Sequence, residues 1–182
     1  IGLSVCAVSF GIGKTQAALP ASLFHKDVFN SIGYFREDLR AAEDLEWFNR
    51  FEQISGPLPN CQNAIVRYNE IPNSLWSVFL KWKNSAFYTF LAGVHKKSII
   101  LYLLTPFLYI VALFFAPLLS VSFFFLYLSI RGIINPIRRS TLGDILGIYY
   151  LIPLMILSAV IIDLAKFGGY LQAQLYKFKS NY

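Results

Sequence analysis

The stretch SIILYLLTPFLYIVALFFAPLLSVSFFFLYLSI, from Ser98 to Ile130, contains no charged residue. About 20 apolar residues are enough for a helix to cross the hydrocarbon of a bilayer, so this stretch is too long for one ordinary span. Pro117 offers a break, because proline can start a helix but cannot continue one. The stretch therefore predicts two short membrane helices, 98–114 and 117–131, joined in a tight hairpin.

The sequence after this stretch predicts one more span. The segment RGIINPIRRSTLGD, Arg131 to Asp144, is expected to be a polar loop, and 145–164 a third membrane helix with Pro153 inside it. The membrane region would then cover 98–165, followed by a basic tail over 166–182. The positive-inside rule leaves the orientation open. With a hairpin, the loop arginines return to the cytoplasmic side and the tail lysines lie outside, whereas one long tilted span reverses this.

The segment before the stretch, 74–97, is expected to lie at the membrane surface. A predicted helix from about Ser74 to Leu91 mixes aromatic side chains with lysines, which is typical of a helix in the headgroup region. Lys96 and Lys97 stand just before the first span, where cytoplasmic cations are common. We therefore expect an interfacial helix and a linker that lead the chain onto the bilayer from the cytoplasmic side.

Residues 1–73 have the composition of a separate unit that faces water. Eight of the ten acidic residues lie in the first half of the chain. Short apolar runs rich in β-branched residues predict buried strands, and helix start and stop signals lie between them. These signals indicate an α/β domain in front of an α-helical membrane region. The predicted elements are strands over Ile1–Phe10 and Ala64–Tyr68 and helices over Lys26–Ile32 and from Ala42 or Glu43 onward.

Charge and cysteine usage exclude several classes of protein. The net charge is +6, but the basic residues stand beside apolar stretches, which fits lipid headgroups and not nucleic acid. Cys6 and Cys61 lack metal-ligand spacing and are interpreted as reduced thiols. His25 and His95 have no partner at ligand spacing, so neither is expected to bind a metal. GIGKT, Gly11 to Thr15, lacks the first glycine of a phosphate-binding P-loop and is expected to be a flexible loop.

The segment LRAAEDLEWFNR, Leu39 to Arg50, places the adjacent acids Glu43 and Asp44 in the first turn of a predicted helix. Carboxylates there stabilise a helix by about 0.3–1 kcal/mol through its dipole. A carboxylate fixed at a helix end can also act as a general base. The pair alone leaves both roles open, and Arg50 could equally hold the helix against neighbouring loops or belong to a site.

The longer segment SLFHKDVFNSIGYFREDLRAAEDLEWFNRF, Ser22 to Phe51, resembles the second half of the catalytic domain of family 2 glycosyltransferases, the inverting enzymes with a GT-A fold. That region has a small residue, an aromatic-basic-x-x-Phe helix, Gly-x-Phe, a spacer, and Glu-Asp before an apolar helix that contains arginine. The resemblance is more specific here than in the membrane region. The residues that match in order are Lys26, Phe29, Gly33 with Phe35, Leu39, Glu43-Asp44, Leu45 and Arg50.

The resemblance implies a partial, Rossmann-like GT-A domain and a membrane-anchored enzyme of the plasma membrane with this domain on the cytoplasmic side. Such an enzyme transfers a sugar from a nucleotide-sugar donor to a hydroxyl of a lipid-linked or polysaccharide acceptor, for cell-surface glycan synthesis. Asp44 would be the general base, and Glu43 would orient it or bind the acceptor. Further acceptor-side candidates are Ser22, Lys26, Arg50, Lys81 and Trp82.

The chain also departs from the family pattern. The Asp-x-Asp motif that binds the divalent metal (Mg²⁺ or Mn²⁺) and the donor diphosphate is absent, so no metal site is expected within these residues. We expect both to bind to a part that precedes Ile1, and the chain, as a fragment, could be inactive alone. Lys81-Trp82 only partly matches the arginine-tryptophan motif of processive synthases, which favours a transferase of single sugars.

Two other classes remain as alternatives. The first is a non-enzymatic membrane protein whose first half is a small cytoplasmic interaction domain. The second is a small transporter, which is disfavoured because Asp163 is the only acid in the predicted spans. Lys166 follows Asp163 by three residues, so a solvated pair near the interface is expected there.

Overall fold

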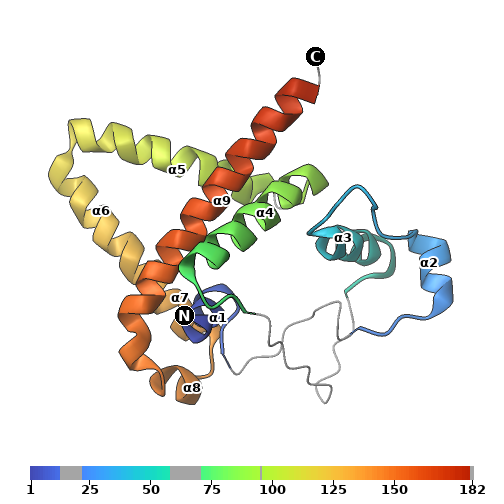
Figure 1. Cartoon of the computed structure of the whole chain (residues 1–182), viewed down its shortest axis with the longest axis horizontal. Helices are drawn as coiled ribbons and strands as arrows, with labels where there is room; N and C mark the ends of the chain where they lie inside the picture. Colours follow the sequence, from blue (N-terminus) through green and yellow to red (C-terminus); the bar gives the residue numbers. More distant parts are fainter. Residues whose placement is uncertain (13–21, 58–70, 95, 181–182) are drawn as a thin grey trace.

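The uncharged stretch forms two helices that separate where the sequence predicts. Helix α5 covers Lys96–Phe115, and α6 covers Pro117–Ser129. Ala116 between them leaves the helical conformation, with φ −148° and ψ 67°, and Pro117 begins α6, where its missing N–H is not needed. The two helices meet in a V in Figure 1. The computed structural model describes residues 1–12, 22–57, 71–94 and 96–180, without the side chains of 96–99, 101–103 and 180.

The helical run that starts at Pro117 continues beyond the predicted span. A π-helical turn, η2 (Ile130–Ile134), and α7 (Asn135–Arg139) extend it to Arg139. The prediction of a polar loop is therefore wrong for its first nine residues, Arg131 to Arg139. The wide π turn accommodates Pro136 in the following turn, because proline at the start of a helical segment leaves no hydrogen bond missing.

Three more helices complete the C-terminal half. They are α8 (Leu142–Leu146), the 3₁₀ turn η3 (Tyr149–Leu151) and α9 (Ile152–Ser180). Residues 166–180, expected to be a separate basic tail, form the second half of α9. Helix α9 contacts several of the other helices, and α4 (Leu75–Ala92) lies along it (Figure 1). Ser74 caps α4, since its hydroxyl accepts a hydrogen bond from the Ser77 N–H at 3.1 Å.

The N-terminal segment is a helix and not the predicted strand. Helix α1 (Gly2–Ser9) packs on α9, and the hydroxyls of Ser4 and Ser158 lie 3.1 Å apart between them. A short apolar run is equally consistent with a buried strand and a buried helix, and packing against α9 decides for the helix. Burial raises the pKa of the Cys6 thiol on this helix, which forms no disulfide. The core of this region consists of Val5, Ala7, Val8, Val78, Ile145, Ile148, Met155, Ala159 and Ile162.

The α/β fold that the sequence and the resemblance predicted is contradicted. The described residues form helices and contain no strand or sheet. The second predicted strand, Ala64 to Tyr68, and also Cys61 and His95 lie outside the described residues. The part of the chain that the structure describes is therefore an all-helical assembly.

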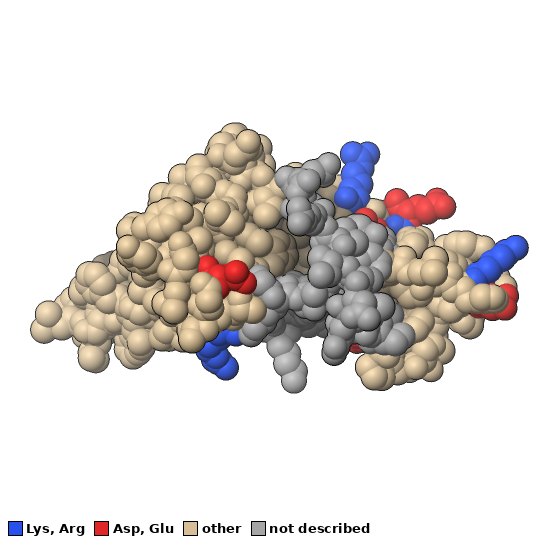
Figure 2. All heavy atoms as spheres, turned by 90° about the horizontal axis from the view of Figure 1, so that it is seen from below, with Lys and Arg blue, Asp and Glu red and all other residues tan. Residues whose placement is uncertain are grey.

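The two helices predicted in the first domain are confirmed. Helix α2 (Lys26–Ile32) ends at Gly33, whose φ of 86° is positive and therefore favours glycine. Helix α3 (Glu43–Ser55) begins at Glu43, one of the two predicted starts. Both lie at the opposite end of the molecule from α5 and α6 (Figure 1). Charged side chains are sparse on the α5–α6 side and gather towards the α2–α3 end in the view of Figure 2.

Two described helical runs are long and apolar enough to cross a membrane. They cover Pro117–Arg139, with 23 residues, and Tyr149–Lys179, with 31 residues. Large apolar side chains on the first run point outward, including Leu118 at 84% exposure and Phe125 at 62%. Such a surface is costly in water and favourable in lipid. The structure therefore agrees with membrane association.

Candidate functional site

The acidic pair that the sequence singles out stands at the first turn of α3. Glu43 and Asp44 are half-buried, and Asp44 Oδ1 accepts a hydrogen bond from the Leu45 N–H at 2.8 Å. Glu43 Oε2 is buried without a hydrogen-bond partner among the described residues. Acidic side chains are favourable in the first turn of a helix because they interact with the positive end of its dipole. The pair is thus a fixed, anionic helix terminus.

Ala42, the residue before the pair, holds an unusual backbone conformation. Its φ of 64° and ψ of 12° are left-handed, and it is the only non-glycine residue with positive φ in the described part of the chain. An L-residue other than glycine pays on the order of 1–2 kcal/mol in this region, and such residues cluster at functional sites. The chain therefore enters α3 through a strained residue, which sets the direction of the backbone at Glu43 and Asp44.

Side-chain hydrogen bonds join α3 to the end of α2. Trp47, fully buried, donates from Nε1 to the Gly33 carbonyl at 2.8 Å. Arg50 donates to the carbonyls of Ile32 at 2.7 Å and Tyr34 at 2.8 Å. Arg50 also donates to both oxygens of the Glu46 carboxylate, one turn earlier in α3. Four of the five N–H donors of its guanidinium are therefore in hydrogen bonds. Arg50 thus takes the structural role that the sequence left open.

Aromatic side chains surround Trp47 and fill the space between α2 and α3. Edge-to-face and tilted rings at these separations are favourable beyond the area that they bury. Ile54, near the C-terminus of α3, lies outside this cluster and is 62% exposed. The rings whose centroids lie within 6 Å of Trp47 belong to Phe24, Phe29, Phe35, Phe48 and Phe51.

A cavity of about 320 Å³ lies where α1, α4, α7, η2 and α9 meet. Leu45 of α3, directly after Asp44, lines its edge. Of the predicted site residues, Lys81 and Trp82 also line it, whereas Ser22 and Lys26 are exposed beside α2. Glu43, Asp44 and Arg50 are not among its lining residues. The structure thus brings the α4 candidates to one cavity and sets the first turn of α3 beside it.

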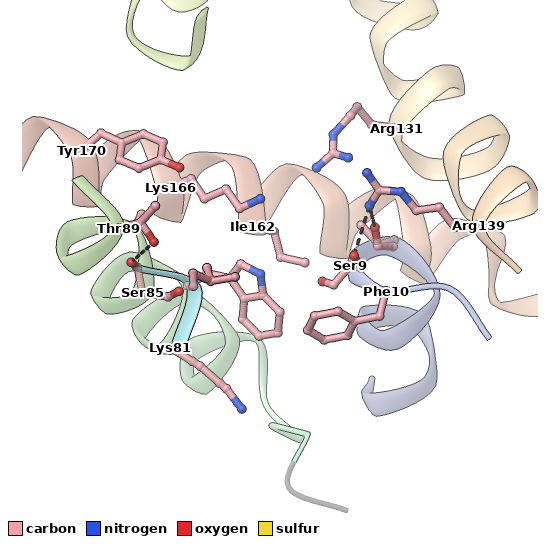
Figure 3. A pocket seen from close by; sticks show the side chains of 14 residues that line it. Ser9, Phe10, Lys81, Ser85, Thr89, Arg131, Arg139, Ile162, Lys166 and Tyr170 are labelled. Carbon is pink, nitrogen blue, oxygen red and sulfur yellow. Dashed lines mark hydrogen bonds between the residues drawn. The ribbon is translucent and has the colours of Figure 1, made fainter. Parts of the chain in front are cut away.

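The cavity wall is strongly basic. Four of its lining residues, Lys81, Arg131, Arg139 and Lys166, are cations, and none of the described lining residues is an acid. Figure 3 shows Arg131, Arg139 and Lys166 converging on the cavity, while Lys81 extends outward from α4. Arg131, Arg139 and Lys166 were not predicted as site residues from the sequence. Their positions in three separate segments give no common spacing, so only the fold brings them together.

One carboxylate partly balances these cations from behind the wall. Arg131 donates to both oxygens of Asp163, at 2.7 Å and 2.6 Å, and the Tyr127 hydroxyl donates to Oδ2 at 2.8 Å. The side chains of Asp163 and Arg131 are 13% and 16% exposed. The predicted solvated pair with Lys166 is therefore corrected: Asp163 is largely buried, and Arg131 holds it in a bidentate pair.

Arg139 and Lys166, two further cations of the wall, lie close to α1 and to Asp163, respectively. Arg139 donates to the carbonyls of Val8 and Ser9, both at 3.1 Å, and so caps the C-terminus of α1. Lys166 stands one turn after Asp163 on α9, and Asp163, Arg131 and Arg139 all lie close enough to act on its charge. Among the described residues, one carboxylate, Asp163, and two further cations, Arg131 and Arg139, thus lie close to Lys166.

The described residues offer no group of three histidine, cysteine, aspartate or glutamate side chains that could hold a metal ion. His25 instead caps α2, because its Nδ1 accepts a hydrogen bond from the Asp27 N–H at 3.4 Å. Comparisons of the chain with protein-family models, with curated proteins and with solved structures give no match.

Proposed function

We propose that this chain forms the acceptor side and the membrane anchor of an inverting glycosyltransferase. The enzyme would transfer a sugar from a nucleotide-sugar donor to a hydroxyl of a lipid-linked or glycan acceptor at the cytoplasmic surface of a membrane that the chain crosses more than once. The donor and its divalent metal would bind to residues other than these. The proposal uses the acceptor-side residues alone and does not require a sheet within this chain.

The observation that carries the proposal is the placement of the Glu43-Asp44 pair. The pair follows the strained residue Ala42 and precedes Leu45, which borders the basic cavity between the membrane-associated helices. In an inverting transfer a carboxylate removes the proton from the acceptor hydroxyl while that oxygen attacks the anomeric carbon and the nucleotide diphosphate leaves. A base on a rigid helix end meets this need because its position costs little reorganisation.

The two acids take different roles in this proposal. Asp44 is the base, and Glu43, whose Oε2 is buried without a partner among the described residues, binds an acceptor hydroxyl or orients Asp44. An unsatisfied buried carboxylate oxygen costs on the order of 1–3 kcal/mol, and a hydroxyl donor from the acceptor would remove that cost. Such an acceptor would bind with its hydroxyls towards the first turn of α3.

The test is the substitution Asp44→Asn in the full-length protein. Asn keeps the shape and the hydrogen bond to the Leu45 N–H but is no base, so we expect turnover to fall by about 10²–10⁴-fold with donor binding retained. Asp27→Asn is the matched control, since Asp27 stands in the first turn of α2 as Asp44 does in α3. Turnover by Asp44→Asn near that of Asp27→Asn would remove Asp44 as the base and favour a non-enzymatic interaction domain.

A further inference from the structure

One side of α9 carries a row of apolar residues that lies opposite α4. Helix α4 packs where Gly169 lies, and the buried residues Ala165 and Ala173 stand one turn before and after it on the same side. The apolar row lies about half a turn around the helix from this contact. We call the row the α9 seam, and its residues are Leu157, Ile161, Leu164, Gly168, Leu171, Leu175 and Phe178.

The spacing of the seam residues is that of a coiled coil. They follow one another in alternating steps of four and three residues, so their mean period is about 3.5, as for the a and d positions of a heptad repeat. The pattern holds without interruption through about three heptads, the length at which it indicates a coiled coil. At Gly168 an added Cβ would meet nothing within 4 Å, which leaves room for a neighbouring helix. The seam therefore predicts that α9 packs against another helix.

The seam exposes enough apolar surface for such a contact. Five of its side chains are between 44% and 65% exposed. Together they expose on the order of 500 Å². Two seams packed on each other would bury about 1,000 Å², which is about the least area of a specific interface. The five side chains are Leu157, Leu164, Leu171, Leu175 and Phe178.

A bilayer is too thin to cover the whole seam. The run Tyr149–Lys179 has 31 residues and is therefore about 46 Å long, whereas the hydrocarbon is about 30 Å thick. Its C-terminal end, from Gln172 to Lys179, mixes polar and basic side chains with the last seam residues and is the end expected outside the hydrocarbon. Leu175 and Phe178 are exposed there, so a protein surface suits them better than lipid headgroups or water.

The charges of α9 are compatible with a second copy of the same helix on the seam. Copies that insert in the same orientation pair in parallel, so each seam residue meets its own counterpart. Beside Leu175 and Phe178, the g position is Gln174 and the e position is Lys179, and the Gln174 amide oxygen can accept a hydrogen bond from Lys179 of the second copy. Asp163 lies off the seam on the side of η2, and Lys166 lines the cavity. No like charges are therefore brought together across the seam.

We propose that two copies of this chain associate in parallel through the α9 seam, as a two-stranded coiled coil that continues beyond the hydrocarbon of the membrane. The seam lies opposite the face of α9 that packs on α4, so the pair forms without rearranging the fold described above. The association does not rest on the proposed function, because it uses neither the cavity nor the first turn of α3.

The pairing is tested by disulfide cross-linking of the full-length protein in its membrane, with the native cysteines replaced by alanine. Leu175→Cys at the centre of the polar half of the seam should form a cross-linked dimer under a mild oxidant. Tyr176→Cys is the matched control, because Tyr176 is 56% exposed and Leu175 57%, but Tyr176 lies off the seam. We expect about tenfold less dimer from Tyr176→Cys, since its Cα atoms would be more than about 7 Å apart in the pair.

Two outcomes of the cross-linking would overturn the pair. Equal dimer from Leu175→Cys and Tyr176→Cys would mean that the copies meet by random collision. Absence of dimer from both Leu171→Cys and Leu175→Cys would assign the seam to lipid or to another protein. An antiparallel pair would also give no dimer at both positions, because each cysteine would then face a different level of the partner helix.

The strength of association is measured by energy transfer between labelled copies diluted in neutral detergent micelles. The double change Leu171→Ser and Leu175→Ser should weaken association about 10- to 100-fold, because four leucines leave the interface. Leu142→Ser on α8 is the control, since Leu142 is 67% exposed and lies off the seam. Seam side chains are exposed in the single chain, so circular dichroism should show both variants folded. Equal association of the two variants would overturn the proposal.

Discussion

Trp47 is the side chain on which the position of the Glu43-Asp44 pair most depends. It lies one turn after the pair, is fully buried among aromatic rings, and satisfies the Gly33 carbonyl at the end of α2. A buried ring and a buried hydrogen bond act together here, because the ring excludes water from the bond and the bond fixes the ring. Any change that loosens Trp47 should therefore be felt at Asp44.

We predict that Trp47→Phe lowers the free energy of unfolding by about 1–3 kcal/mol, because the Gly33 carbonyl loses its donor while the aromatic packing is mostly kept. Trp76→Phe is the control: Trp76 is 67% exposed, and its replacement should change stability by less than about 0.5 kcal/mol. Chemical denaturation in detergent measures both. Similar midpoints for the two variants would contradict a structural role for the Trp47 N–H.

The helices that the sequence predicted best are those with a local signal. Glu43 begins α3 as expected, and Pro117 separates α5 from α6 as expected. The first ten residues were assigned wrongly because an apolar run carries no signal for the partner that buries it, and α9, more than 140 residues away, is that partner. The extension through Ile130–Arg139 was missed for a similar reason, since the charges there suggested solvent.

Helices α4 and α9 approach closely where Gly169 faces α4. A Cβ on Gly169 would overlap the Lys83 carbonyl oxygen and come within 2.9 Å of the Ala86 Cβ, whereas a Cβ on Gly168 would meet nothing within 4 Å. Small residues at a helix contact allow this approach, in lipid as in water. The neighbouring glycines therefore differ in what they contribute to the packing of α9.

We predict opposite effects for alanine at these two glycines. Gly169→Ala should push α4 away from α9 and destabilise the fold by about 1–3 kcal/mol, whereas Gly168→Ala should stabilise it by up to about 1 kcal/mol through helix propensity. Thermal unfolding followed by circular dichroism in detergent distinguishes them. Destabilisation of the same size in both variants would mean that the close contact of α4 and α9 does not form.

The candidate site shows which information the sequence lacked. Lys81 and Trp82 were predicted because they partly match the arginine-tryptophan motif of the family that the chain resembles, and both line the cavity. Arg131, Arg139 and Lys166 were attributed to membrane interfaces or to a solvated pair, since each alone looks like an ordinary cation beside an apolar stretch. Only the return of the 117–139 run onto α9 shows that these cations share one wall.

Large apolar side chains on the outer face of α6 are exposed, which suits contact with the lipid of a membrane. Phe125 of α6 is 62% exposed in the structure, and a lipid environment for this side chain makes a charge there expensive. We expect Phe125→Lys to cost about 2.5–3.5 kcal/mol of insertion free energy and to reduce insertion of the 117–139 run about hundredfold, as read by labelling of single cysteines on either side of the membrane. Leu23→Lys, at a position 99% exposed beside α2, should leave insertion unchanged. If Phe125→Lys inserts as well as Leu23→Lys, this face of α6 contacts water or protein instead of lipid, and the membrane anchor must lie in α9.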